Sequence, residues 1–150
     1  MVETKSLILA VDDEPDIGQL IKRVLESAGY QVITAIDGNQ ALDLVAQRKP
    51  DLVLLDVKMP GKSGIEVFRE LKISHPDTGV IMATAIVDVN VAIDTLREGA
   101  LDYLVKPFNV NELVISVVGA LEKRRLILEN RDYQLNLERK VTEQTQLLQQ

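Results

Sequence analysis

The sequence predicts an α/β fold in which a doubly wound, five-stranded parallel sheet is flanked by five helices. One observation is that short β-branched runs alternate five times with segments of helical periodicity. Another is that four of the five runs are apolar without polar alternation, which is typical of strands buried on both faces of a parallel sheet. The chain has 150 residues, of which 46% are hydrophobic, and this is enough for one core.

The predicted strands are the β-branched runs. They cover residues 7–11, 31–35, 52–55, 80–83 and 103–105. The second run contains Gln31 and Thr34, so we expect it to lie nearer an edge of the sheet.

Helices are predicted where apolar residues recur three and four positions apart. The first four such segments lie around residues 17–28, 41–46, 65–72 and 89–96. Gly29, Pro50 and Gly99 are typical stop signals for three of them. Asn109, followed three residues later by Glu112, resembles a capping box that opens a fifth helix.

The fifth helix has no stop signal, because good helix formers continue from Leu121 to Gln150 without Pro or Gly. We therefore divide the chain into a domain at 1–121 and a helical extension at 122–150. Nothing in the extension could bury a second core, so we expect it to be a linker to an output domain missing from this chain.

Leucines recur every seven residues in the extension, at Leu121, Leu128 and Leu135. Arg125 and Asp132 interrupt the pattern, so it predicts an imperfect coiled coil and a homodimer. The alternative is a solvated amphipathic helix that frays, since isolated helices are marginal in water.

Composition limits the function and the compartment. The chain has no cysteine, which excludes disulfides, thiolate metal sites and a Cys nucleophile, and which suits the cytoplasm. No signal peptide or membrane span is visible in the sequence. The net charge is −6, with about −7 on the first 120 residues because residues 121–150 hold six basic and five acidic groups. We expect no direct contact with nucleic acid, because binding its backbone needs a basic face.

Polar side chains follow four of the predicted strands, and none comes from the second. They are Asp12 and Asp13 after the first strand, Asp56 after the third, Thr84 after the fourth and Lys106 after the fifth. Doubly wound folds bind ligands at the carboxyl edge of the sheet. A strand order of 2-1-3-4-5 would gather these side chains around the third strand.

Such a cluster of carboxylates needs a cation. Two carboxylates about 5 Å apart repel by about 3 kcal/mol at an effective dielectric constant near 20. Oxygen ligands without His or Cys favour a hard ion, so we expect Mg²⁺ or Mn²⁺ as the cofactor. Lys106 would balance the remaining negative charge.

The motifs around these residues resemble those of the receiver domains of two-component response regulators, the CheY-like superfamily with a flavodoxin-like sheet. The resemblance covers about residues 5–122. It rests on VDDEP at 11–15, LLDVKMPGKSG at 54–64, ATA at 83–85 and DYLVKPF at 102–108.

The resemblance implies a phosphorylated switch and not a turnover enzyme. Asp56 would accept a phosphoryl group from a sensor histidine kinase or a phosphotransfer protein. The metal would be held by Asp13, Asp56 and the backbone carbonyl of Lys58, with Asp12 supporting it through water.

The remaining motif residues correspond to the family's switch and tuning positions. Thr84 and Lys106 would take phosphoryl oxygens, and Tyr103 would follow Thr84, changing the face made by the fourth helix, fifth strand and fifth helix. Lys58 and Ile86 would tune the rate of dephosphorylation. The family pattern also favours a cis peptide bond before Pro107.

Two other functions are alternatives for this set of residues. A phosphatase of the haloacid-dehalogenase type also uses strand-end Asp, Thr and Lys around Mg²⁺, but it needs a second Asp two residues after its nucleophile. This chain has Glu14 two residues after Asp12, and no substrate cap is visible. A dimerisation scaffold without phosphotransfer is hard to reconcile with the complete set of polar residues.

Overall fold

The computed structural model describes the backbone of residues 5–148 and the side chains of residues 5–144. Its sheet has five parallel strands in the order β2-β1-β3-β4-β5, which confirms the predicted fold class. The strands are β1 (Leu7–Val11), β2 (Gln31–Ala35), β3 (Leu52–Asp56), β4 (Gly79–Ala85) and β5 (Asp102–Lys106). β2 lies at an edge, as the polar residues in its sequence predicted.

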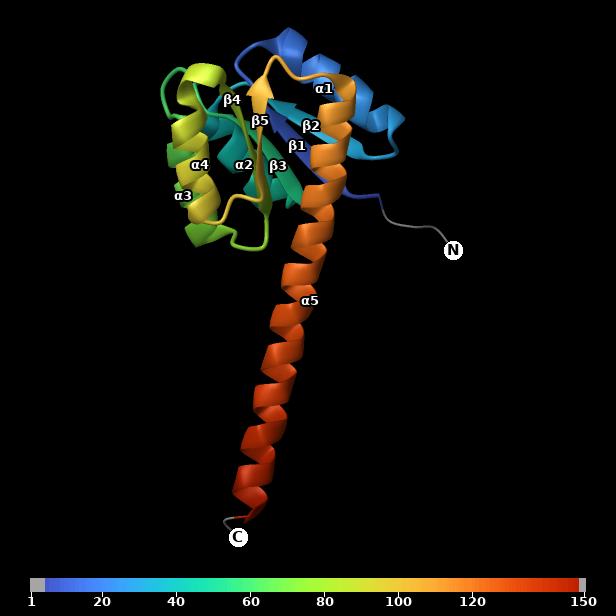
Figure 1. Cartoon of the computed structure of the whole chain (residues 1–150), viewed down its shortest axis with the longest axis vertical. Helices are drawn as coiled ribbons and strands as arrows, with labels where there is room; N and C mark the ends of the chain where they lie inside the picture. The colour runs from blue at the N-terminus through green and yellow to red at the C-terminus, as the bar shows by residue number, and fades with distance from the viewer. Residues whose placement is uncertain (1–4, 149–150) are drawn as a thin grey trace.

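Helices cover both faces of the sheet (Figure 1). They are α1 (Pro15–Ser27), α2 (Gly38–Arg48), α3 (Gly64–Ser74), α4 (Val89–Arg97) and α5 (Val110–Leu148). Buried residues of α1 and α5 form one core cluster with one face of the sheet. Buried residues of α2, α3 and α4 form the other cluster, around Phe68. A layer of helices on each face is expected, because the side chains of the strands are buried on both faces of the sheet.

The strand register sets the height of the polar residues along the carboxyl edge. Val11 pairs with Leu55 across the β1–β3 boundary, so Asp12 and Asp56 follow at the same level. Ala85 pairs with Lys106 across the β4–β5 boundary. The short 3-10 helix η1 (Ile86–Asp88), which joins β4 to α4, has no counterpart among the predicted elements.

Helix starts follow the predicted capping chemistry. The Asn109 carboxamide oxygen accepts a 2.8 Å hydrogen bond from the Glu112 backbone N–H, which confirms the cap of α5. The Glu112 carboxylate accepts from the Asn109 side-chain amide, where a capping box would use the backbone amide. The preceding Lys106–Pro107 peptide bond is cis, as predicted.

Helix α5 has 39 residues and extends well beyond the sheet (Figure 1). At 1.5 Å per residue it is about 58 Å long. Leu121 packs against the core, and Leu128 is half-buried beside the α3–β4 loop. The rest of the domain thus partly covers Leu121 and Leu128, and the predicted coiled coil stays a prediction. Leu135 is exposed.

The residues that the structure describes include no helix with a stretch long and apolar enough to cross a membrane.

Candidate functional site

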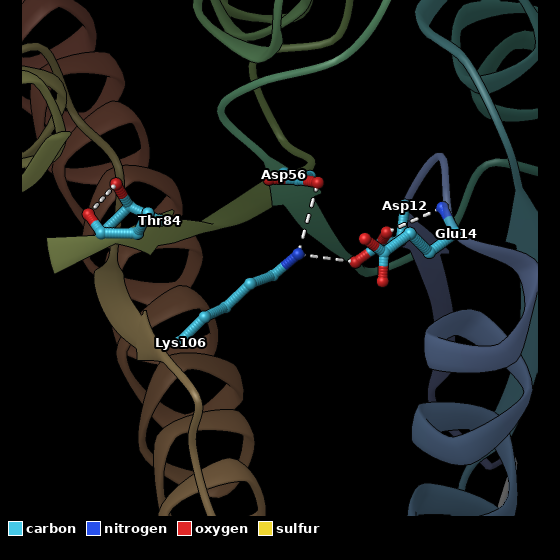
Figure 2. Close-up of polar contacts among 6 residues, drawn as sticks. Asp12, Glu14, Asp56, Thr84 and Lys106 are labelled. Carbon is cyan, nitrogen blue, oxygen red and sulfur yellow. Dashed lines mark hydrogen bonds and ion pairs between the residues drawn. The ribbon is translucent and has the colours of Figure 1, made fainter. Parts of the chain in front are cut away.

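Three strand ends bring two carboxylates and one ammonium group together at the carboxyl edge of the sheet. The Lys106 Nζ donates to Asp12 Oδ2 at 2.7 Å and to Asp56 Oδ2 at 3.2 Å (Figure 2). These residues come from β5, the end of β1 and β3. The prediction that distant strand ends converge is thus confirmed for these three residues.

Local structure fixes Asp12 on this edge. Its Oδ1 accepts a 2.9 Å hydrogen bond from the Glu14 backbone N–H, which holds the turn from β1 into α1 (Figure 2). Pro15 then begins the helix, where its missing N–H costs no hydrogen bond. One carboxylate oxygen of Asp12 therefore orders the loop while the other contacts Lys106.

The site contains unusually buried polar residues. Asp12 is 3% exposed, Asp56 is 7% exposed and Thr84 is fully buried. Aspartate is seldom this buried unless it is paired, because an isolated buried charge is costly. Lys106 supplies only one positive charge for the two buried carboxylates.

Burial raises the pKa of the Asp56 carboxyl. The Lys106 ammonium works against this effect, but the negative charges of Asp12 and Asp13 add to it, so the pKa lies above its ordinary value. The ionised Asp56 carboxylate is thus short of compensating positive charge.

Burial has the opposite effect on the pKa of Lys106, because it disfavours the charged ammonium form. Burial lowers the pKa of its ammonium group, but the hydrogen bond to Asp12 and the charges of Asp56 and Asp12 outweigh burial. The pKa of Lys106 is therefore raised, and the side chain stays positively charged at neutral pH.

The carboxylates suit a divalent cation. Ligand oxygens of Asp12, Asp13 and Asp56 all lie within 4.8 Å of one another. Asp13 is exposed and lines an open pocket of about 440 Å³ with Lys58 and the loop after β3. An all-oxygen donor set with surplus negative charge is the environment that Mg²⁺ and Mn²⁺ prefer. The residues present thus fit the expected ion.

Gly64 lets the backbone of α3 approach that of Asp56. A Cβ atom at position 64 would lie 2.0 Å from the Asp56 carbonyl oxygen and 2.9 Å from Val57 Cα. Only glycine fits in this space, so the final residue of the LLDVKMPGKSG motif helps to position Asp56.

Three other predicted site residues have no hydrogen bond to Asp12, Asp56 or Lys106. The Thr84 hydroxyl donates to the Ala85 carbonyl at 3.0 Å (Figure 2). Tyr103 is half-buried against the core on the α4 side. Ile86 is 74% exposed in η1.

Lys58 has a partner that sequence reasoning missed. Its Nζ lies 3.5 Å from Asp88 Oδ2, which links the loop after β3 to the start of α4. The two residues are 30 positions apart, and no sequence pattern connects them.

Comparisons with known proteins agree with this geometry. Residues 8–118 match the family model described as response regulator receiver domain. The chain is 38% identical over 135 residues to the C4-dicarboxylate transport transcriptional regulatory protein DctD of Pseudomonas aeruginosa, covering 90% of this chain and 29% of DctD. It is 39% identical over 127 residues to the nitrogen assimilation regulatory protein NtrX of Azorhizobium caulinodans, covering 83% of this chain and 28% of NtrX.

Solved structures show the same fold. A response regulator receiver domain protein from Clostridium thermocellum is 36% identical, with a TM-score of 0.77, covering 81% of this chain and 98% of that one. NtrX from Brucella abortus is 34% identical, with a TM-score of 0.81, covering 87% of this chain and 30% of NtrX.

This chain spans less than a third of the length of DctD and NtrX, and the match lies in the region that carries Asp12, Asp56 and Lys106. The chain belongs to the response regulator receiver domain family of two-component signal transduction.

Proposed function

We propose that Asp56 is the phosphoacceptor of this receiver domain and that its donor is a phosphohistidine on a sensor kinase or phosphotransfer protein. The observation that carries the proposal is the convergence of Asp12, Asp56 and Lys106 from three strands. A nucleophilic carboxylate, a fixed ammonium and a cation-binding pair of acids are the groups that phosphoryl transfer to aspartate requires.

In the proposed reaction an Asp56 carboxylate oxygen attacks the donor phosphorus in line. The new O–P bond forms as the N–P bond to the donor histidine breaks, and the imidazole leaves with the electron pair of that bond. Lys106 interacts with the phosphoryl oxygens, which compete with Asp56 and Asp12 for its ammonium.

The cofactor in this proposal is Mg²⁺ or Mn²⁺. Asp13, Asp56 and the Lys58 backbone carbonyl would hold it, with Asp12 supporting it through water. When bound, the ion supplies positive charge to the oxygens of the transferring group. The ligand oxygens of Asp12, Asp13 and Asp56, which lie within 4.8 Å of one another, support this assignment.

Phosphorylation would then bias the conformation. A phosphoryl group on Asp56 offers the Thr84 hydroxyl a stronger acceptor than the Ala85 carbonyl that it now contacts. Inward movement of Thr84 would let Tyr103 follow, altering the face made by α4, β5 and α5. A complete switch, from 1:99 to 99:1, needs about 5.5 kcal/mol of differential stabilisation.

Two side chains at the rim would tune the lifetime of the phosphorylated state. Lys58 and Ile86 lie two residues after Asp56 and Thr84. The exposed Ile86 side chain could shield an acyl phosphate from water if it turned over the site, and we expect slow dephosphorylation on this ground.

The output of the signal would pass through α5. DctD and NtrX are much longer than this chain and are named as regulatory proteins, which supports an output domain beyond the receiver. Tyr133 and Leu137 are exposed one helical turn apart on the extension, and we assign them to contact with a second copy of the chain. Sedimentation of the full chain and of a chain ending at Asp132 would test the homodimer. The full chain should sediment as a dimer and the shortened chain as a monomer.

Acetyl phosphate tests phosphotransfer without a kinase. Intact mass measurement after incubation with acetyl phosphate and Mg²⁺ should show one added phosphoryl group in the wild type and none in Asp56→Ala. Equal labelling of the two proteins would refute the proposal.

A further inference from the structure

Helix α5 contacts the body of the domain, residues 5–109, at the end of the sheet opposite Asp56. There it passes the loop between α3 and β4, which contains Asp77, and the turn before β3, which contains Asp51 (Figure 1). The Arg124 Nε donates to the Asp77 backbone carbonyl at 2.8 Å, and Arg124 Nη1 lies 3.4 Å from Asp51 Oδ1. One arginine of the helix thus contacts two separate segments of the body.

A second arginine binds the same loop two helical turns further along. Arg131 Nη1 donates to Asp77 Oδ1 at 2.6 Å, and Nη2 donates to Oδ2 at 3.4 Å. This two-point contact is the favoured geometry of an arginine with a carboxylate. The hydrogen bond from Arg131 lowers the pKa of Asp77, which agrees with a close pair. We call Asp51, Asp77, Arg124 and Arg131 the strap.

The body side of the strap is tied to the sheet. Asp51 Oδ2 accepts a 2.9 Å hydrogen bond from the Leu7 backbone N–H at the start of β1. The Asp51 carbonyl accepts from the Gly79 N–H at the start of β4, at 3.0 Å. The strap therefore connects α5 to two central strands and not merely to a mobile loop.

Apolar packing accompanies the ion pairs. Leu128 is half-buried beside the loop of Asp77, between the levels of Arg124 and Arg131. The Lys123 Nζ donates to the Leu101 carbonyl just before β5, at 3.1 Å. In contrast, every described side chain from residue 132 to residue 144 is exposed. Among the described side chains of α5, Arg131 is the furthest along the helix that has an ion pair with the rest of the domain.

We propose that the strap makes α5 part of the receiver's rigid body as far as Arg131, so that the solvent-exposed helical arm begins at Asp132. This moves the predicted domain boundary ten residues towards the C-terminus. One end of the rigid segment follows Lys106 at the site, and the other end is fixed by the strap.

The inference does not depend on phosphorylation, so the full, unphosphorylated chain is the correct test material. Hydrogen exchange measured by mass spectrometry should show residues 122–131 better protected than residues 132–144. Arg131→Gln should speed exchange of residues 122–131 by about three- to fivefold, as expected for the loss of an exposed ion pair. Peptides from β1 would report any loss of global stability.

Arg139 provides a matched control, because it is an arginine on the exposed arm. Arg139→Gln should leave residues 122–131 unchanged. Exchange of residues 122–131 as fast as the arm in the wild type would overturn the proposal. An effect of Arg131→Gln no larger than that of Arg139→Gln would also overturn it. The exchanged pair Asp77→Lys with Arg131→Glu should regain protection relative to either single change.

Discussion

Lys106 contacts Asp12 more closely than it contacts the proposed phosphoacceptor, at 2.7 Å against 3.2 Å to Asp56. Asp12 is also the more buried of the two acids. Asp12 therefore acts as the principal counterion that orients the lysine. The hydrogen bond from Lys106 to Asp56 is longer and therefore weaker. The Asp56 carboxylate is thus available to other cations and to a phosphoryl donor.

Removing one negative charge from the cluster should stabilise the metal-free protein. Asp13→Asn should raise the free energy of unfolding by about 1 kcal/mol in the presence of EDTA, since Asp13 repels Asp56 across a partly solvated gap. The variant should also lose most of the stabilisation by Mg²⁺ that urea unfolding detects in the wild type.

Asp16→Asn is the control for this charge effect. Asp16 is exposed in the first turn of α1 and lies outside the cluster, so its loss should be slightly destabilising. The assignment of Asp13 would be refuted by a variant with unchanged stability in EDTA and an unchanged response to Mg²⁺.

Gly64→Ala should move the phosphoacceptor. The added methyl group would collide with the Asp56 carbonyl, and we expect a loss of stability of about 1–3 kcal/mol. The displaced Asp56 should also be phosphorylated more slowly by acetyl phosphate. Thermal unfolding and intact mass against time measure the two effects.

Gly119→Ala is the matched change at a glycine with open space. No atom lies within 4 Å of a Cβ added there, and the residue lies within α5, so the variant should gain about 0.5–1 kcal/mol. Equal effects of the two substitutions would contradict the close approach at Gly64.

The Asp77–Arg131 pair predicts a pH dependence. Because Arg131 lowers the pKa of Asp77 below its ordinary value of 3.8, the unfolded chain binds this proton more readily than the folded chain. The pair therefore stabilises the fold above pH 3.8 and loses this contribution as the pH falls through the lower, folded pKa.

The melting temperature of the wild type should accordingly exceed that of Asp77→Asn at neutral pH. The difference should shrink towards zero in acid. The difference in melting temperature should be small at every pH, because the pair is largely solvated. A difference that is constant from neutral pH to pH 3 would count against the ion pair.

Ile86→Asn tests shielding of the phosphorylated site. If Ile86 limits access of water, the asparagine variant should lose phosphate faster, by up to about tenfold, which corresponds to 1.4 kcal/mol in the barrier. Val87→Asn, at a neighbouring and similarly exposed position, should have little effect. A rate in Ile86→Asn that is equal to or slower than that of the wild type would remove Ile86 from the mechanism.

The sequence predicted the sheet and the position of the site because parallel strands share one carboxyl edge. Once the apolar runs and their order were assigned, Asp12, Asp56 and Lys106 had to lie near one another. The capping role of Asn109 was also predictable, because a helix cap depends on residues only three positions apart.

Other features depend on long-range packing, which periodicity does not encode. Leu121 and Leu128 fit a seven-residue seam, but the pattern could not tell whether a second chain or the chain's own body covers them. No sequence pattern predicts the contacts of Arg124 and Arg131, since their partners lie about 50 to 70 positions earlier. Similarly, the preference of Lys106 for Asp12 depends on side-chain conformations.

The most direct test of the account is to locate the phosphoryl group. After treatment with acetyl phosphate and Mg²⁺, reduction with borohydride would convert the phosphorylated aspartate to homoserine, and peptide mass spectrometry would identify it. The account predicts one modified residue per chain, Asp56, with labelling reduced in Asp13→Asn. A label on Asp12, as a nucleophile after the first strand would give, or no label in the peptide containing Asp56, would contradict it.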